Sequence, residues 1–526
     1  MAADDLFRLT YATMYDPPED LHDRYEAALA DLKANLGQNH GMLINGQDVL
    51  ADETFEDRSP INTNWLLGTF QQGDRQHAQQ ALAAARKAFP IWSGMSWQER
   101  VGLMRKAADE INRRIFEFSA VISMEVGKNR MEALGDAAEA ADLIRYACDQ
   151  MEANNGYLVK MGKDPLVGYD ATNHSLLRPY GVWLVISPFN FPAALTGGPA
   201  GAALVAGNTI VMKPASDTPW TTRLLAECFR DAGLPDGAFN YVTGPGRTLG
   251  EELTSSDQVD GITFTGSYDV GMHIFRIFAA GTYPRPTILE MGGKNPSIVT
   301  KEADLERAVT GIVRSAFGLQ GQKCSANSRI YVQRPVYQDF VARVTAATQA
   351  LKVGDPTERS VFLGPVVNQS SYDDFKTFAE ELSDAGRFAF GGKVLTEGDY
   401  ANGYYCQPTI AVDVPNEHRL WAHEMFLPIT MIRPFDELEE AMQLANDSVY
   451  GLTAGFYGSE AQAEWFFENI EAGVTYANRP QGSTTGAWPG FQPFGGWKGS
   501  GSSGKNAGGQ YYLPLYMHEQ IHTIIR

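Results

Sequence analysis

Residues 181–192 read GVWLVISPFNFP, and this stretch decides the expected fold. Its first six residues form an almost continuous apolar run, as in a strand that is buried on both faces of a parallel sheet. The prolines then end the strand and open a turn. Similar strand-like runs follow at 208–213, 238–242 and 261–265, with helical stretches such as 221–232 between them. This alternation of strands and helices predicts a doubly wound parallel sheet.

Glycine-rich turns follow the last two of these runs, at 243–250 (TGPGRTLG) and 265–271 (TGSYDVG). Turns that connect a strand to the start of a helix in this way bind the phosphates of dinucleotides. Neither turn has the G-x-G-x-x-G spacing, and either one alone is as compatible with plain helix–strand packing. Two of them in one α/β block favour a nucleotide site.

Apolar residues recur at helical spacing before this block and predict a series of helices. Gly37 and Pro90 are expected to end the first two, because neither residue continues a helix easily. Between the last of these helices and residue 181 the pattern alternates, which predicts a hairpin at 156–179. The helices are expected at about 25–36, 75–89, 101–115 and 130–154.

A second α/β block is expected from about 290 to 473, beginning with the phrase LEMGGKNPSIV. The tail from Arg479 is rich in glycine and aromatic residues but turns apolar again near its end. An ordered loop is therefore expected there rather than low-complexity disorder. Residues 511–526 are predicted to form a final strand or two.

The composition is typical of a globular chain and argues against two classes of partner. Hydrophobic residues make up 44% and charged residues 20%. Lys plus Arg number 43 against 63 for Asp plus Glu, a net charge of −20, so neither nucleic acid nor a membrane is an expected partner. No apolar run is long enough to cross a bilayer, and no signal peptide is visible. We expect a cytoplasmic protein.

Four cysteines, at 148, 228, 324 and 406, are scattered without C-x-x-C spacing, which predicts neither a metal site nor a disulfide framework. Cys324 lies in the stretch FGLQGQKCSANSR at 317–329. A core cysteine normally has apolar neighbours, whereas this one lies among glycines and small polar residues beside Lys323. Backbone amides and the Lys323 ammonium are expected to favour the thiolate. The pattern predicts a nucleophile, the alternative being a small residue in a tight turn.

Seven short motifs occur in order along the chain: SPFNFP, KPAS, FTGS, LEMGGKNP, GQKCSA, HEMFLP and PFGGWKGSG. Each is weak alone, but the ordered set resembles the aldehyde dehydrogenase superfamily from about Leu43 to the C-terminus. The resemblance implies an α/β fold with two doubly wound parallel-sheet domains and a small β oligomerisation arm. The implied boundaries are 1–155 with 180–289 for a dinucleotide-binding domain, 290–480 for a catalytic domain, 156–179 with 505–526 for the arm, and 481–504 for a substrate-anchoring loop region.

The chemistry of this family explains why three of the residues are needed. An aldehyde cannot lose hydride until a nucleophile adds to it, and Cys324 is the implied nucleophile. The Asn190 side-chain amide and the backbone N–H of Cys324 are implied to stabilise the oxyanion of the thiohemiacetal. Glu290 is the implied general base that activates water to hydrolyse the thioester. A salt-bridged carboxylate at a strand end is the alternative for Glu290, and the glycines beside it disfavour that alternative.

The resemblance also implies NAD or NADP as the cofactor. Lys213 is assigned to the adenosine ribose, Ser267 to the pyrophosphate, and Glu424 and Phe426 to the nicotinamide ribose and ring. Ser216 stands where a glutamate would bind both ribose hydroxyls and repel a 2′-phosphate, so its small side chain leaves room for NADP. The other implied cofactor residues are Ile186, Ser187, Pro188, Phe189, Gly246, Gly250, Thr265 and Gly266.

The phrases QKCSANSR, EVGKNR and TGAWPGFQPFGG look like those of 1-pyrroline-5-carboxylate dehydrogenases. Those enzymes oxidise L-glutamate γ-semialdehyde to L-glutamate in proline catabolism. The substrate residues that this likeness implies are Ser325 and the backbone N–H groups of Gly486 and Ala487 for the carboxylate, Phe191 and Phe494 for the aliphatic part, and Glu139 at the edge of the pocket.

Two alternatives stay open for the function. One is a dehydrogenase of another carboxylated semialdehyde, such as succinic semialdehyde. The other is a catalytically silent family member, against which the presence of Cys324, Glu290 and Asn190 counts strongly.

The hairpin at 156–179 and the strand after 511 have little core of their own. In the family such segments pair across subunits and cover exposed strand edges. The resemblance therefore implies a homodimer or a higher homo-oligomer, with the C-terminal strand joining a neighbour.

Overall fold

The computed structural model describes residues 17–526 except 164, 166–167, 169 and 484–486. Its first large sheet has seven strands in the order β12-β11-β8-β9-β10-β2-β3; the first five are parallel, β2 pairs antiparallel with β10, and β3 pairs antiparallel with β2. Every residue of β9 and β11 is buried, as the continuous apolar runs predicted. The strands are Thr287–Glu290 (β12), Gly261–Thr265 (β11), Val182–Ile186 (β8), Thr209–Lys213 (β9), Phe239–Tyr241 (β10), Met42–Ile44 (β2) and Gln47–Val49 (β3).

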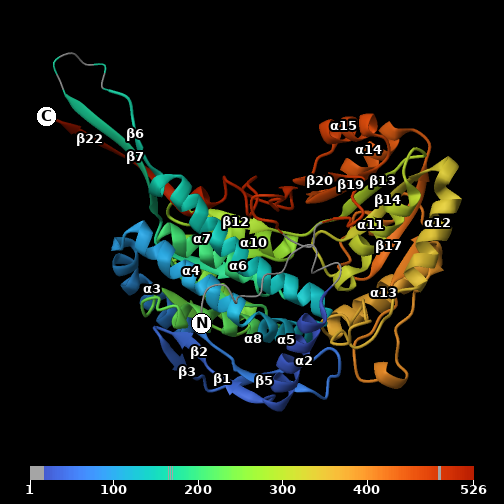
Figure 1. The fold of residues 1–526 in the computed structure, drawn as a ribbon, viewed down its shortest axis with the longest axis horizontal. Coiled ribbons are helices and arrows are strands. Elements are labelled where there is room, and N and C mark those ends of the chain that lie inside the picture. The colour runs from blue at the N-terminus through green and yellow to red at the C-terminus, as the bar shows by residue number, and fades with distance from the viewer. Residues whose placement is uncertain (1–16, 164, 166–167, 169, 484–486) are drawn as a thin grey trace.

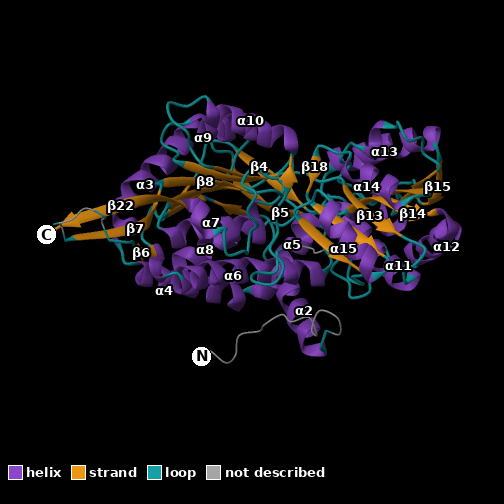
Figure 2. Ribbon diagram, turned by 90° about the horizontal axis from the view of Figure 1, so that it is seen from above, coloured by secondary structure: helices purple, strands orange, loops and turns teal. Residues whose placement is uncertain are grey.

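Helices cover both faces of this sheet, as Figure 2 shows. One face packs against α3, α9 and α10, and the other against the layer that contains α6, α7 and α8. This is the doubly wound α/β arrangement expected from the sequence. The helices are Arg75–Gly94 (α3), Trp97–Arg113 (α4), Ile115–Val126 (α5), Arg130–Ala153 (α6), Ala194–Ala206 (α7), Pro219–Asp231 (α8), Glu251–Ser255 (α9) and Tyr268–Ala279 (α10).

The prediction that Pro90 ends the second helix is wrong, since α3 continues to Gly94. Trp92 is fully buried beyond the proline, and its indole N–H donates to the carbonyl oxygen of Leu204 at 3.0 Å. The stabilisation from these Trp92 contacts offsets the cost of the backbone hydrogen bond that is lost at a proline inside a helix. The first predicted helix lies at Glu19–Ala34 (α2), and Gly37 has a φ of +81° as expected of a residue that follows a helix end.

The second large sheet also has seven strands, in the order β15-β16-β17-β14-β13-β19-β20, and only the β15–β16 pair is antiparallel. Residues 291–294 alone separate β12 of the first sheet from β13 of the second. The strands are Arg387–Phe390 (β15), Thr409–Val412 (β16), Ile429–Phe435 (β17), Asn327–Gln333 (β14), Asn295–Val299 (β13), Thr453–Tyr457 (β19) and Val474–Ala477 (β20). Around them lie Leu305–Phe317 (α11), Arg334–Gln349 (α12), Gln369–Ala385 (α13), Leu438–Asn446 (α14) and Glu460–Asn469 (α15).

A three-stranded sheet projects from the body, at the upper left of Figure 1. It consists of Leu158–Lys160 (β6), Ala171–Pro179 (β7) and Met517–Ile525 (β22), in the order β22-β7-β6. The nine residues of β22 pair with β7 in antiparallel register, so the predicted hairpin and C-terminal strand form one arm within the chain. One edge of β22 carries no strand within the described residues.

Two small sheets contain the remaining strands. One joins Gln38–His40 (β1), Leu66–Gln71 (β5) and Thr54–Arg58 (β4), and the other joins Tyr450–Gly451 (β18) and Trp497–Lys498 (β21). Of the helices in the described part of the chain, none has both the length and the apolar character needed to span a membrane.

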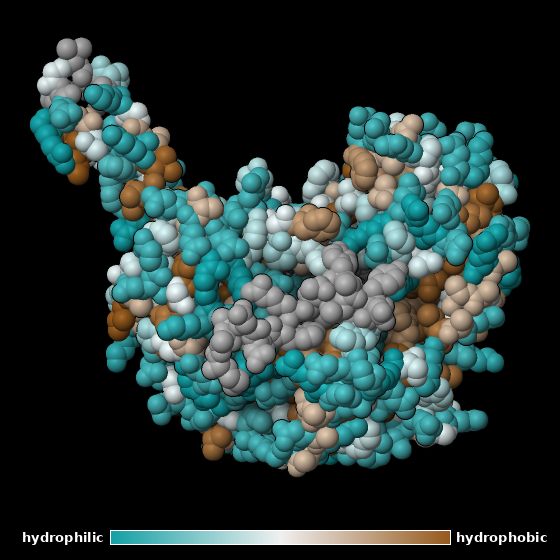
Figure 3. Space-filling model, in the orientation of Figure 1, coloured by the Kyte–Doolittle hydropathy of each residue, from teal (hydrophilic) through white to brown (hydrophobic). Residues whose placement is uncertain are grey.

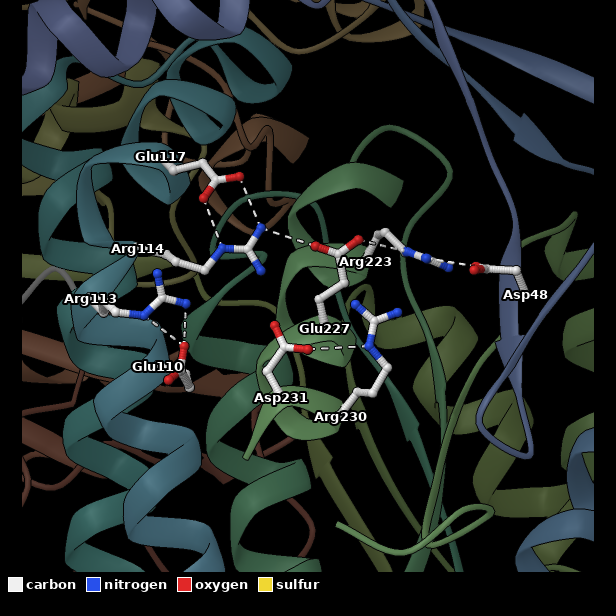
Figure 4. A network of polar contacts seen from close by, with 9 residues as sticks. All are labelled: Asp48, Glu110, Arg113, Arg114, Glu117, Arg223, Glu227, Arg230 and Asp231. Atoms are coloured by element: carbon white, nitrogen blue, oxygen red, sulfur yellow. Dashed lines mark hydrogen bonds and ion pairs between the residues drawn. The ribbon is translucent and has the colours of Figure 1, made fainter. Parts of the chain in front are cut away.

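A network of charges fixes α8 against its neighbours (Figure 4). Glu227 on α8 accepts from Arg114 at 3.0 Å and from Arg223 at 3.1 Å, and Arg223 also reaches Asp48 on β3 at 2.6 Å. Arg114 in turn pairs with Glu117 on α5 at 2.8 Å. Because Arg114 and Arg223 are largely buried, these contacts are screened less by water and salt than pairs on an open surface.

Candidate active site

Glu290 and Cys324 line one cavity although they follow elements of different sheets. Glu290 is the last residue of β12, in the first sheet, whereas Cys324 lies between α11 and β14, in the second. Thr265 at the end of β11 and Ser325 line the same cavity. The short connection from β12 to β13 brings the carboxyl end of one sheet next to the other, so a carboxylate and a thiol meet at the boundary.

The turn that carries Cys324 has an unusual backbone. Leu319, Gln320 and Gly321 all have positive φ, at +48°, +55° and +68°. The Gln320 amide holds this turn by donating to the carbonyl oxygens of Gly127 at 2.6 Å and Pro365 at 2.7 Å. A Cβ on Gly321 would lie 2.2 Å from the carbonyl oxygen of Leu427, so only glycine fits there. The strained turn is thus held by buried hydrogen bonds, as is common at functional sites.

Asn190 lies next to this turn. Its side-chain Nδ2 donates to the carbonyl oxygen of Gln322, two residues before Cys324, at 3.0 Å, and Asn190 itself is 3% exposed. The contact holds the amide beside the cysteine loop, and one of its two N–H groups is left for another acceptor.

The prediction of a thiolate at Cys324 is wrong. Burial, and then the negative charges of Glu424 and Glu290, raise the pKa of the Cys324 thiol to about 12, although the amides of Ser325 and Cys324 oppose this. The predicted cation does not prevent this rise: Lys323 Nζ is buried and lies 3.5 Å from the carbonyl oxygen of Arg314. Burial lowers the pKa of Lys323, while the charges of Glu132 and then Cys324 act in the opposite direction.

Glu290 is partly buried with its Oε2 atom shielded from solvent, and within the described residues it lacks the ion pair considered as its alternative role. Within the described residues its Oε2 atom has no hydrogen-bond partner, and Glu290 takes part in no salt bridge. Burial raises its pKa well above the ordinary value, and a backbone N–H of Gly496 counteracts this only in part. A carboxyl group of raised pKa that faces a thiol is suited to accept and return protons near neutral pH.

The implied substrate residues Glu139, Phe191, Ser325, Ala487 and Phe494 all line the cavity of Cys324 and Glu290. The Ala487 N–H donates to Glu139 Oε1 at 2.6 Å, which ties the loop after residue 486 to α6. Burial raises the pKa of Glu139 to about 8. Gly486 lies outside the described residues.

Lys128, to which no motif assigned a role, packs against Phe191, a residue that lines the cavity. Lys128 Nζ lies 3.7 Å from the centre of the Phe191 ring and 2.9 Å from Asp136 Oδ2, and both charged side chains are fully buried. Asp136 also accepts from the Ala194 N–H, near the start of α7, at 2.8 Å. The phrase EVGKNR, which contains Lys128, was the available signal, because a lysine beside an apolar helix end needs a buried partner.

A second group of residues lies at the carboxyl ends of the strands of the first sheet and fits a dinucleotide. Lys213 ends β9, is buried, and donates to the carbonyl oxygen of Pro214 at 3.1 Å. Burial lowers its pKa to about 8, and within the described residues it has no carboxylate partner. Ser187 Oγ, just after β8, is buried without a hydrogen-bond partner in the same part of the chain. A polar ligand would satisfy both groups.

The glycine-rich turns present backbone at the same strand ends. Ser267 caps α10, its Oγ accepting from the Val270 N–H at 3.4 Å, and the first amides of this helix suit a phosphate. A Cβ on Gly246 would meet open space, whereas one on Gly250 would lie 3.6 Å from the Lys213 side chain. Thr265 and Gly266 precede the cap directly, and Ser216 is exposed after β9.

The implied nicotinamide residues come from the second sheet. Glu424 Oε1 accepts from the Gly293 N–H at 2.8 Å, and burial raises the pKa of Glu424 to about 7. Phe426, which has a φ of +56°, packs edge-to-face on Phe189 at 5.8 Å between ring centres. Because the charge of Glu424 acts on the Cys324 thiol, this group adjoins the nucleophile. Ile186 and Pro188 flank Ser187 at the carboxyl end of β8, in the first sheet.

The family model "Aldehyde dehydrogenase family" matches residues 49–521 of the chain. The chain is 39% identical over 500 residues to the 1-pyrroline-5-carboxylate dehydrogenase of Geobacillus sp. (strain WCH70), and the match covers 94% of both chains. It is 36% identical over 496 residues to the 1-pyrroline-5-carboxylate dehydrogenase of Bacillus subtilis (strain 168), a match that covers 93% of this chain and 94% of the other. A solved structure of 1-pyrroline-5-carboxylate dehydrogenase from Thermus with bound NAD superposes with a TM-score of 0.92 at 33% identity and full coverage of both chains. The order of motifs, the two sheets and these likenesses agree, and the chain belongs to the aldehyde dehydrogenase family.

Proposed function

We propose that this chain oxidises L-glutamate γ-semialdehyde, the open form of 1-pyrroline-5-carboxylate, to L-glutamate in proline degradation, with NAD or NADP as the oxidant. The observation that carries the proposal is the cavity lined by both Cys324 and Glu290. The names of the relatives supply the substrate, and the substrate residues implied by the sequence line that same cavity. The dinucleotide-binding and catalytic domains would meet at this cavity, with the boundaries given above.

In the first half of the reaction, the Cys324 sulfur adds to the aldehyde carbon. Burial raises the pKa of the thiol, so its proton must leave as the C–S bond forms, to water or to one of the two carboxyl groups that line the cavity, Glu139 and Glu290. The Asn190 amide and the Cys324 backbone N–H donate to the oxyanion. When bound, the nicotinamide accepts the hydride that leaves this carbon, and a thioester remains on Cys324.

In the second half, Glu290 takes a proton from water while the water oxygen adds to the thioester carbon. The C–S bond breaks, the carboxylate product leaves, and the sulfur regains a proton. Because Glu290 lacks a salt-bridge partner within the described residues, its carboxyl group is free to exchange this proton.

At the far end of the substrate, Ser325 and the backbone N–H of Gly486 would bind the carboxylate, and Phe191 and Phe494 would flank the aliphatic part. The Ala487 N–H, also predicted to bind the carboxylate, donates to Glu139 Oε1 instead, so it would have to leave Glu139 to reach the substrate. An arginine clamp, natural for succinic semialdehyde, is not among the residues that line the cavity.

Steady-state turnover with a panel of aldehydes, each measured with NAD and with NADP, tests the proposal. We expect glutamate γ-semialdehyde to have the highest kcat/KM. A higher kcat/KM for succinic semialdehyde would favour the alternative substrate, and no turnover of any aldehyde would favour a catalytically silent protein.

Replacing Ser216 with glutamate should shift the cofactor preference from NADP toward NAD. The new carboxylate accepts from the ribose hydroxyls and repels a 2′-phosphate, so the kcat/KM ratio of NADP to NAD should fall by about tenfold or more. Ser370→Glu is the matched control, because Ser370 is exposed on α13, in the other sheet's helical layer. An unchanged ratio in Ser216→Glu would show that another residue sets the preference.

We further propose a homodimer or higher homo-oligomer built through the arm. Its support is the open edge of β22 and a set of apolar side chains that the arm exposes by about half: Leu158, Val159, Ile521, Ile524 and Ile525. The four cysteines are all free, which fits the reducing cytoplasm as the place of this reaction.

Deleting residues 518–526 should turn the oligomer into a monomer or an aggregate while the two large sheets remain folded. The cut removes β22 but keeps Met517 and Tyr516, which are buried. Light scattering at micromolar concentration gives the mass, and replacing Ile521, Ile524 and Ile525 with threonine is the milder variant that keeps strand propensity. An intact chain that is monomeric under these conditions contradicts the proposal.

A further inference from the structure

Tyr512 is a buried residue of the cavity to which neither the motifs nor the proposed mechanism gives a role. It immediately precedes the short 3₁₀ helix Leu513–Tyr516 and is 7% exposed. The same cavity contains Cys324 and Glu290. The segment is fixed to the first sheet's helical layer, since Asn208 Nδ2 donates to the carbonyl oxygen of Tyr516 at 2.9 Å.

A chain of hydrogen bonds leads from the first sheet to the Tyr512 hydroxyl. The Trp183 indole N–H on β8 donates to Thr263 Oγ1 on β11 at 3.0 Å, and Thr263 Oγ1 lies 3.1 Å from the Tyr516 hydroxyl. The Tyr516 hydroxyl donates to the Tyr512 hydroxyl at 2.9 Å. The rings of this chain also pack together, with 4.7 Å between the centres of Trp183 and Tyr516 and 5.5 Å between those of Tyr516 and Tyr512.

The direction of every bond in this chain follows from the number of hydrogens available. An indole N–H can only donate, and each hydroxyl has a single hydrogen. Tyr516 uses its hydrogen on Tyr512, so Thr263 must donate to Tyr516 while it accepts from Trp183. Only the hydrogen of Tyr512 is left without an acceptor within the described residues, and Tyr512 lines the cavity that holds the unpartnered Oε2 of Glu290.

We propose that Tyr512 is a positioning residue for Glu290, its hydroxyl donating to the Glu290 carboxylate while the thioester on Cys324 is hydrolysed. Hydrogen bonds of this kind are often completed only once the reacting group is in place. The chain from Trp183 fixes the position of the Tyr512 oxygen, and within the described residues no hydrogen bond yet joins it to Glu290 Oε2, so this bond would form once the carboxylate ionises. The inference rests on the proposed function of Glu290 as the general base.

The groups that face Glu290 explain why a hydrogen-bond donor would matter for its ionised form. Cys324, Tyr512 and Tyr516 are the titratable groups on which its charge acts, and Glu424 faces Cys324 from the second sheet. None of them is a cation, and burial raises the pKa of Glu290 well above its ordinary value. A hydrogen bond to the ionised form lowers that pKa. Without Tyr512, the base is therefore ionised only at higher pH.

The test measures hydrolysis of an acyl group on Cys324 without any dinucleotide. Stoichiometric p-nitrophenyl acetate acylates the sulfur and releases p-nitrophenolate, and intact mass then follows the loss of the acetyl group from pH 5.5 to 9. In the step measured, a water oxygen bonds to the acyl carbon, the C–S bond breaks, and the proton of the water passes through Glu290 to the departing sulfur.

Tyr512→Phe should leave the release of p-nitrophenolate unchanged. The acid limb, the part of the pH profile in which the deacylation rate falls with decreasing pH, should move to higher pH by about one unit. At pH values below the limb this is about a tenfold loss of rate. Tyr516→Phe is the structural control, because it breaks the same buried chain but keeps the Tyr512 hydroxyl. Its limb should move less. Tyr511→Phe, at a residue 63% exposed, should behave as wild type.

Three outcomes separate the possibilities. A limb that moves in Tyr512→Phe and less in Tyr516→Phe supports the inference. A limb that moves equally in both variants, or in neither, overturns it and leaves the proposed function intact. Failure of wild-type Cys324 to become acylated would instead overturn the proposed function. The double variant Tyr512→Phe/Tyr516→Phe, which leaves no orphaned Tyr516 hydrogen, should reproduce the Tyr512→Phe shift if the single variant folds poorly.

Discussion

Cys324→Ala should lower kcat for aldehyde oxidation by about 10⁴-fold or more, while NAD and NADP still bind. The sulfur supplies the bond through which hydride loss becomes possible, and no other thiol takes its place: Cys148, Cys228 and Cys406 are buried, and burial raises the pKa of each. Steady-state kinetics measure the loss of turnover, and fluorescence titration measures dinucleotide binding.

The matched control is Cys406→Ala, which removes a cysteine that is 2% exposed in the core of the second sheet. It should keep wild-type kcat and lose some thermal stability. Residual turnover near wild type in Cys324→Ala would remove Cys324 from the role of nucleophile.

Glu290→Gln should separate the two halves of the reaction. Formation of the thioester is still possible, so mixing enzyme, aldehyde and cofactor should give a burst of reduced cofactor of up to one equivalent per subunit. The following steady state should be slower by about 10²–10⁴-fold, as is typical after loss of a general base. Stopped-flow absorbance of the reduced nicotinamide records both phases.

The pH dependence adds a second signature for Glu290. The ionised carboxylate is the active form, and its pKa is raised, so wild-type deacylation should fall as the pH decreases through that raised pKa. Glu290→Gln has no such group and should lose this limb. Glu397→Gln, at an exposed residue, should keep both the rate and the limb. An unchanged steady rate without a burst in Glu290→Gln would refute the assignment.

The raised pKa values of Cys324, Glu290 and Glu424 have a common cause in burial. Cys324, Glu290 and Glu424 are brought together at the boundary of two sheets, and the pKa of each is raised. All three groups are therefore biased toward their neutral forms.

Local sequence determined most of the elements. The apolar runs at 181–186, 209–213 and 261–265 became buried parallel strands, because a strand covered on both faces needs apolar side chains at every position. The ordered motifs likewise pointed to Cys324, Glu290 and Asn190 before any coordinates were known, since glycines and polar residues at strand ends mark positions where a ligand meets backbone.

Only the tertiary structure decided how these elements act on one another. Pro90 lies inside α3 because Trp92 packs beyond it, a contact more than a hundred residues away along the chain. Lys323 is next to Cys324 in sequence, yet its ammonium donates to the carbonyl oxygen of Arg314, and burial outweighs its charge in setting the pKa of the thiol. Tyr512 owes its orientation to Trp183 and Thr263, on two strands far away in sequence. Hydrogen-bond direction and burial depend on all neighbours at once, whereas the sequence pattern records only the neighbours along the chain.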